Sequence, residues 1–336
     1  MGKLNPIPPP AASKIGLSML ALAAFVFSSR ALAEETAAPA PSPATSDARE
    51  RGTVAVATFE TPKAAVDAFM HAVRANASAA LTQILGGKAA DLLSSGDAAF
   101  DEKSRLSFIK NYDAKHALVY EGKDRVTLTV GTHDWPLPFP IVRNHGAWSF
   151  DAEAGAQELA YRRIGHNELD AMKVMRALAD AQKTYAAGSH DGSPAGAYAQ
   201  RVRSKPGTQN GLYWSVAENE TPSPAGDLLA EASTEEAPEG VQPNGKPTPF
   251  HGYYYRVLRK QGEHAPGGAR DYIVEGRMTG GFAILAWPAE YGRSGVMTFM
   301  LSKGGKLYQS DLGSGTDSAA KGLRTFDPDS SWSVVP

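Results

Sequence analysis

The N-terminal half of the chain places apolar residues first at helical spacing and then at strand spacing. Residues 61–74 begin with Thr-Pro, a helix start, and continue with apolar side chains at i, i+3, i+4 and i+7. Similar patterns predict a short helix capped by Ser78 and another over 103–112. Residues 117–120 and 125–130 favour strands, because apolar and polar side chains alternate in the second run.

Two prolines limit the structures that the next apolar run of this half can form. Pro138 and Pro140 restrict residues 137–142 to an edge strand or an extended segment. An Asn-His-Gly turn then leads into a last strand over 147–151. Helices followed by a curved meander resemble the cone-shaped nuclear-transport-factor-2-like fold, which implies an N-terminal α+β domain over 58–157 with a pocket between its helices and its sheet.

The C-terminal half begins with the longest helical pattern and ends in strands. Residues 158–187 carry an apolar stripe at helical spacing, and a loop-rich excursion with a Pro- and Glu-rich tract follows at 188–250. Five β-rich runs separated by short Gly-containing turns then favour an antiparallel meander: Gly252–Leu258, Asp271–Glu275, Gly281–Trp287, Val296–Ser302 and Lys306–Ser310. The expected fold class is α+β, with a second domain over 158–336 in which the long helix packs on this sheet.

The first 33 residues have the pattern of a cleavable secretory signal. Lys3 and Lys14 precede a short apolar run, and the small residues Ala31 and Ala33 frame a cleavage site after Ala33. Residues 34–57 are rich in Ala, Pro, Ser and Thr and are expected to form a disordered linker. The pattern predicts a periplasmic protein with no stable membrane span after cleavage.

Composition removes several function classes. There is no cysteine, which excludes thiol catalysis, thiolate metal sites and disulfides. Removing the three basic residues of the signal from 34 leaves 31 against 36 acidic residues, so a general nucleic-acid surface is not supported. There is no H-E-x-x-H, G-x-S-x-G or phosphate-binding loop, so no metal, cofactor or catalytic residue is assigned. The oligomeric state is left open.

Several long segments carry a family resemblance. PFHGYYYRVLRKQGEHAPGGARDYIVEGRMTGGFAILAWPAEYGRSGVMTFMLSKGGKLYQSDLG, RRIGHNELDAMKVMRALADAQKTYA, NGLYWSVAENETPSPAGDLLAEA and FDPDSSW occur in this chain. Together they resemble the bacterial domain-of-unknown-function 2950 family over residues 58–336, which implies an exported envelope protein without an assigned activity. The helix and strands of the C-terminal half resemble, more distantly, the globular part of type II secretion pseudopilins. The apolar N-terminal segment is not adjacent to that helix, which argues against a pilus-like fibre.

Two C-terminal segments hold the main candidate contact residues. One is a basic and aromatic run, and the other is a loop that places an indole, a carboxylate and a phenol together after a strand. Both are also explained by strand and turn packing, because aromatic residues are enriched in strands. The candidates for ligand or partner contacts in this half are His251, Tyr253, Tyr255, Arg256, Asp271, Trp287, Glu290 and Tyr291.

The leading hypothesis is a non-catalytic envelope binding or assembly module that uses the aromatic sheet and has a protein or polymer partner. One alternative is an envelope hydrolase that pairs Glu290 with Asp271 or Asp311, because glycoside hydrolysis needs two facing carboxyls. The other is capture of a small ligand in the N-terminal domain, near His133 and Trp135.

Overall fold

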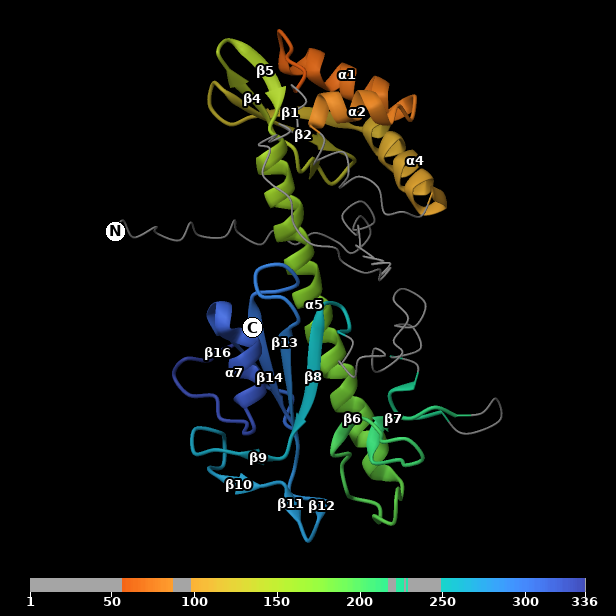
Figure 1. The fold of residues 1–336 in the computed structure, drawn as a ribbon, viewed down its shortest axis with the longest axis vertical. Helices are drawn as coiled ribbons and strands as arrows, with labels where there is room; N and C mark the ends of the chain where they lie inside the picture. The colour runs from red at the N-terminus through yellow and green to blue at the C-terminus, as the bar shows by residue number, and fades with distance from the viewer. Residues whose placement is uncertain (1–55, 87–97, 217–221, 227, 229–248, 336) are drawn as a thin grey trace, which may run out of the picture. The chain divides into compact units, whose positions relative to one another are not determined.

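The computed structural model describes residues 56–86, 98–216, 222–226, 228 and 249–335. They form two compact units, divided between Tyr161 and Arg162 (Figure 1). The predicted signal over 1–33, nearly all of the predicted linker and most of the Pro- and Glu-rich tract lie outside the described residues.

The first unit begins with helices that the sequence pattern located well. Helix α1 (Pro62–Arg74) starts as predicted, because the Thr61 hydroxyl accepts a hydrogen bond from the Ala64 amide at 3.1 Å. Helix α2 (Ser78–Leu85) corrects the predicted cap: its N-cap position is Ala77, and Ser78 lies inside the helix. Helix α4 (Ala98–Ala114) is longer at both ends than the predicted 103–112.

The sheet of the first unit is antiparallel, with strand order β1-β2-β4-β5 and the short β3 paired with β2. Residues 137–142, predicted as an edge strand or an extended segment, do not form an edge strand. Residues 137–140 pass outside any strand, and the strand that follows lies between two others, because both prolines precede its ladder. The strands are β1 (His116–Tyr120), β2 (Arg125–Val130), β3 (Trp135–Pro136), β4 (Ile141–Asn144) and β5 (Ala147–Phe150).

Helices and sheet of the first unit enclose one core. The Phe69 ring of α1 lies against Phe108 of α4 and Phe150 of β5, with centroid distances of 6.0 and 5.5 Å. Leu128 and Ile141 from the sheet are fully buried in the same cluster. The arrangement is helices packed on an antiparallel sheet, and the cone-shaped fold in particular stays a prediction.

The long helix α5 (Ala152–Ala187) confirms the longest helical prediction but starts earlier than residue 158. The Asp151 side chain accepts a hydrogen bond from the Ala154 amide at 3.0 Å, as a helix cap does. The predicted division at 157/158 therefore falls inside this helix, and so does the division between the two units.

The second unit contains an antiparallel sheet of strand order β16-β15-β14-β13-β8, which confirms the predicted C-terminal sheet. The predicted strand over 271–275 is not part of it. That segment forms two small ribbons, β9–β10 and β11–β12, before the chain returns to pair β13 directly with β8. The sheet strands are β8 (Tyr253–Leu258), β13 (Ala283–Pro288), β14 (Met297–Ser302), β15 (Leu307–Asp311) and β16 (Ser333–Val334).

Shorter elements surround this sheet. The ribbons are β9 (Lys260–Gln261), β10 (Arg270–Asp271), β11 (Ile273–Val274) and β12 (Arg277–Met278). A parallel pair, β6 (Arg201–Arg203) and β7 (Gly211–Tyr213), precedes β8, and the 3-10 turn η2 (Gly313–Gly315) leads into α7 (Thr316–Gly322).

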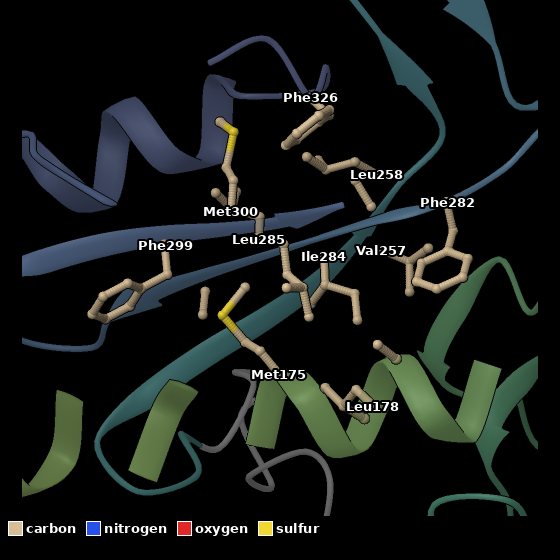
Figure 2. Packing of buried hydrophobic residues seen from close by; sticks show 14 of the residues in the cluster. Met175, Leu178, Val257, Leu258, Phe282, Ile284, Leu285, Phe299, Met300 and Phe326 are labelled. Carbon is tan, nitrogen blue, oxygen red and sulfur yellow. The ribbon is translucent and has the colours of Figure 1, made fainter. Parts of the chain in front are cut away.

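The main sheet is covered on both faces. Figure 2 shows Met175 and Leu178 of α5 against the face that carries Val257 and Ile284, and Phe326 on the other face beside Leu258. Both faces are therefore dry, which explains why β13 is buried at every position.

Candidate functional site

A groove of about 890 Å³ runs along strand β8 in the second unit. Helix α5, strand β6, the β9–β11 segment and the end of α7 supply its other walls. The charge of this lining is one-sided: seven cationic residues against the single carboxylate of Asp271. The cationic residues are Arg201, Arg203, Arg256, Arg259, Lys260, Lys321 and Arg324.

Strand β8 presents one backbone edge toward the groove, because it is the terminal strand of its sheet. Tyr253 exchanges backbone hydrogen bonds with Phe250 on the side away from β13, at 3.0 and 2.8 Å. Backbone groups in an antiparallel strand alternate between its two sides, so those of Tyr255 and Val257 point to the same open side. No ladder joins β8 to β6 in the part of the chain that the structure describes.

Four of the cations are free to meet a ligand. The side chains of Arg201, Arg259, Lys260 and Arg324 are exposed. Within the described residues, none of these four side chains makes a hydrogen bond or an ion pair. Cationic side chains without partners keep their attraction for an incoming anion.

Arg256 has a different role from the four free cations. Its Nη1 donates to the carbonyl oxygens of Ala320 and Leu323 at 3.0 and 3.1 Å, where helix α7 ends. Its guanidinium also lies 4.8 Å from the centre of the Trp287 ring. Burial, together with the nearby charge of Arg324, lowers the pKa of Arg256. Arg256 therefore forms a fixed wall that holds α7 against the sheet.

The aromatic candidates of this region mainly support the walls of the groove and do not form a solvent-facing surface. Trp287 is 5% exposed, and its indole nitrogen lies 3.4 Å from the carboxylate of Asp317. Tyr253 is fully buried, and its hydroxyl donates to the Met297 carbonyl oxygen at 2.9 Å. Burial raises the pKa of Tyr253 far above its usual value. Tyr255 is partly buried, with its hydroxyl 3.4 Å from the Phe250 carbonyl oxygen.

His251 lies at the turn that leads into β8. Its φ of 47° is in the left-handed region, and its Nδ1 lies 3.6 Å from a carboxylate oxygen of Asp170 on α5. Burial raises the pKa of Asp170, but hydrogen bonds from His166 and Lys173 outweigh this effect and lower it to about 2. This ionised carboxylate therefore lies close to the turn beside the groove.

Glu290 and Asp271, the first of the two carboxylate pairs proposed for hydrolysis, do not lie together. Glu290 follows the end of β13 that pairs with Tyr253, whereas Asp271 pairs with Lys260, just beyond the other end of β8. A six-residue strand separates the two positions by about 20 Å. Glu290 instead forms an ion pair with Arg293 at 2.9 Å.

Asp311 lies at the same end of the sheet as Glu290, because it pairs with Met297. The Tyr291 hydroxyl lies 3.3 Å from the Asp311 carboxylate, so these two candidate residues meet. No hydrogen bond or ion pair links Glu290 to Asp311 within the described residues. Glu290 therefore lies in the bend after β13, whereas Asp311 ends β15 and accepts a hydrogen bond from the Gly313 amide at 2.8 Å.

The candidates in the first unit do not share one environment. His133 is exposed, and its Nδ1 lies 3.4 Å from the hydroxyl of the neighbouring Thr132. Trp135 is partly buried and packs against the core of the unit. Within the described residues, no group of three His, Asp or Glu side chains could hold a metal ion. No helix there is long and apolar enough to cross a membrane.

Sequence reasoning missed the four free cations. They come from β6, from the end of β8 with β9, and from the segment after α7, so no local pattern joins them. The adjacent pair Arg259-Lys260 and the alternating pair Arg201 and Arg203 were the available signals. Both are short and have no distinctive spacing.

Comparison with known proteins gives one match. The family model described as a protein of unknown function, DUF2950, matches residues 56–335. Neither the curated proteins nor the solved structures include a match to this chain. The predicted family is therefore confirmed, and the likeness to pseudopilins gains no support.

Proposed function

Because the chain belongs to the DUF2950 family, whose description names no ligand, we propose a function from the groove itself: a non-catalytic envelope binding module for an acidic, extended peptide segment. The observation that carries the proposal is the set of four free cations around one groove. An acidic peptide would supply carboxylates to these cations and apolar side chains to the groove floor.

The charge of the groove is a local feature. The whole chain has a formal net charge of −2, so the cations along β8 do not follow from a basic composition. A cleft that concentrates one sign of charge raises the local concentration of the opposite charge and accelerates its binding. This supports an anionic partner, although the chain itself is mildly acidic.

The floor of the groove and the edge of β8 favour a peptide among anions. Val202 lines the groove and is only partly buried, so it can receive an apolar side chain, whereas Val174 and Leu178, the apolar lining residues of α5, are buried in the core. The backbone groups of Tyr255, which is partly buried, point away from β13 and can pair with an extended chain, which is a recurring mode of peptide recognition. A simple inorganic anion would use neither feature.

The proposed function includes a location of the protein in the cell envelope. Residues 1–33 have the pattern of a secretory signal, and export would bring the groove to envelope proteins. Expression in a Gram-negative host should give a periplasmic protein whose N-terminal residue is Glu34. Mass spectrometry of the intact chain tests this, and retention of residues 1–33 would contradict it.

The hydrolase alternative receives less support. A paired-carboxylate mechanism needs two carboxyls that face one another, and Glu290 faces Arg293. Capture of a small ligand in the first unit is also less supported, because His133 is exposed while Trp135 packs on the core.

A binding experiment with a matched pair of probes tests the groove. We would titrate the protein into fluorescein-labelled Glu-Val-Glu-Phe-Glu-Val-Glu and follow anisotropy, with Lys in place of every Glu in the control peptide. The acidic peptide should bind, the basic one should not, and the affinity should fall as salt rises. The substitution Arg259→Glu should weaken binding about tenfold, because it reverses one charge of the groove.

Arg277→Glu is the matched control for charge. Arg277 is an exposed arginine on β12, outside the groove lining, and its side chain has no partner within the described residues. This variant should bind the acidic peptide as the unchanged protein does. Equal binding of both peptides, or equal loss with both variants, would contradict the proposal.

A further inference from the structure

Strand β1 leaves one edge of the first unit's sheet open. It is the terminal strand, and Val119 and Tyr120 on it are 46% and 60% exposed. The opposite edge is different, because Phe59 exchanges backbone hydrogen bonds with Trp148 of β5 at 2.7 and 2.8 Å. Within the described residues, no strand pairs with β1 on its outer side. An open edge with exposed apolar side chains is a template for a further strand.

The ladder defines which backbone groups are available. The Glu121 amide donates to Arg125, and the Lys115 carbonyl oxygen accepts from Gly131, so both residues face β2. Because the sides alternate along a strand, the backbone groups of His116, Leu118 and Tyr120 point outward. Leu118 lies at the centre of this set, and the other two residues are placed evenly around it.

The charges at the two ends of β1 are opposite in sign and equally far from Leu118. Lys115 precedes the strand by one residue, and Glu121 follows it by one. We propose that β1 pairs in antiparallel orientation with β1 of a second copy of this chain, with Leu118 opposite Leu118. In that register Lys115 lies opposite Glu121 of the other copy, and His116 lies opposite Tyr120.

Existing ion pairs fit this register. Lys115 is bound to Asp134 at 2.7 Å, and Glu121 lies 3.2 Å from Arg125 and 2.8 Å from the Thr127 hydroxyl. Both side chains are about half exposed, at 47% and 52%. In the antiparallel register, the Lys115–Asp134 ion pair of one copy lies beside the Glu121–Arg125 ion pair of the other. Lys115 and Glu121, which have opposite charges, are then adjacent. Parallel pairing would set Lys115 against Lys115 and Glu121 against Glu121, which is destabilising.

The proposal concerns a symmetric contact between copies and is independent of the groove on the second unit. A two-fold contact uses the same patch on both partners, so each residue meets its complement twice. The strand is short, and we expect a dimer that dissociates on dilution. Pairing would cover the apolar side chain of Val119 and the open backbone groups of the strand.

Charge reversal tests the register directly. Sedimentation equilibrium on the chain from residue 34 onward should show a monomer and a dimer exchanging with concentration. Lys115→Glu places two acidic residues opposite each other at both ends, and Glu121→Lys places two lysines there. Each single variant should raise the dimer dissociation constant about tenfold or more.

Mixing the two variants distinguishes the proposed pairing from simple damage to the fold. A Lys115→Glu copy and a Glu121→Lys copy are complementary at both ends, so the mixture should form a heterodimer although neither variant dimerises alone. The double variant should dimerise like the unchanged chain. A wild-type monomer at about 0.5 mM, far above the micromolar range of ordinary specific contacts, would overturn the proposal. Failure of the mixture to associate would do the same.

A cross-link gives an independent readout, because the chain has no cysteine. The register sets Ala117 opposite Val119 of the other copy at a spacing that a disulfide can bridge. Oxidation of mixed Ala117→Cys and Val119→Cys chains should give mainly the mixed covalent dimer. A statistical mixture of all three dimers would contradict the register.

Discussion

The guanidinium of Arg256 lies 4.8 Å from the centre of the Trp287 ring and at the same time binds the last carbonyl groups of helix α7. One side chain thus links strand β8, strand β13 and α7. The carbonyl groups at a helix C-terminus have no partner inside the helix, and a cation there satisfies them.

We expect Arg256→Ala to destabilise the second unit by about 2 kcal/mol, because it removes charged hydrogen bonds and a cation–π contact. Urea unfolding followed by tryptophan fluorescence measures the loss. Arg277→Ala is the control, since that arginine is exposed and outside these contacts, and its effect should stay within about 0.5 kcal/mol. Equal effects of the two variants would contradict this role of Arg256.

Asp170 should make the stability of the second unit depend on acid pH. Its pKa is about 2 in the folded protein against an ordinary value of 3.8, so the folded state favours the ionised form. The stabilisation is complete above pH 4 and is lost as the pH falls from about 4 to 2. Its upper limit is about 2 kcal/mol.

The substitution Asp170→Asn should remove this pH dependence, as measured by unfolding curves at several pH values. Asp180→Asn is the matched control on the same helix, because the Asp180 side chain is 73% exposed and forms an ion pair with Lys183. The control should keep the slope of the unchanged protein between pH 4 and 2. If the unfolding free energy of Asp170→Asn still falls between pH 4 and 2 as in the unchanged protein, groups other than Asp170 cause the pH dependence.

Glu168 should anchor α5 to the start of β14. Its carboxylate accepts hydrogen bonds from the Val296 and Met297 amides at 2.9 and 3.0 Å. Glu168→Ala leaves both amides without this partner and should cost about 2–3 kcal/mol of unfolding free energy. Glu168→Gln retains an acceptor oxygen and should cost clearly less. If the two variants lose the same stability, the hydrogen bonds are not the cause.

Two glycines of α5 should respond in opposite directions to the same change. A Cβ at Gly155 would lie 1.9 Å from the Phe139 ring, whereas a Cβ at Gly165 meets nothing within 4 Å. Gly155→Ala should therefore destabilise by about 1–3 kcal/mol through overpacking. Gly165→Ala should stabilise by about 0.5–1 kcal/mol, because alanine favours the helix. Thermal unfolding of the two variants measures both signs.

Local patterns predicted the elements where one side chain or one alternation decides the structure. Thr61 caps α1 as expected, and residues 125–130 form β2 with the predicted bounds. Tertiary pairing decided the rest. Residues 271–275 look like a strand, but β13 pairs with β8 and leaves them in a side ribbon.

Local sequence patterns predicted even less of the groove than of the secondary structure. The run from His251 to Arg256 was identified because its aromatic and basic residues are adjacent in sequence. Arg201 and Arg324 became part of the same site only when β6 and the end of α7 came to line β8. Tyr253 and Trp287, two of the aromatic residues singled out from the sequence, are buried supports, because a sheet covered on both faces needs large side chains inside.

The short strand β16 has a consequence for assembly. It pairs with Tyr308 and Gln309 of β15, so the sheet of the second unit ends in a two-residue strand on that side and in the six-residue β8 on the other. The sheet of the first unit is likewise capped by Phe59 on one side. A two-residue strand and a single bridging residue offer an incoming strand few backbone groups. A further strand is therefore expected to pair at β1 or β8, the longer terminal strands of the two sheets.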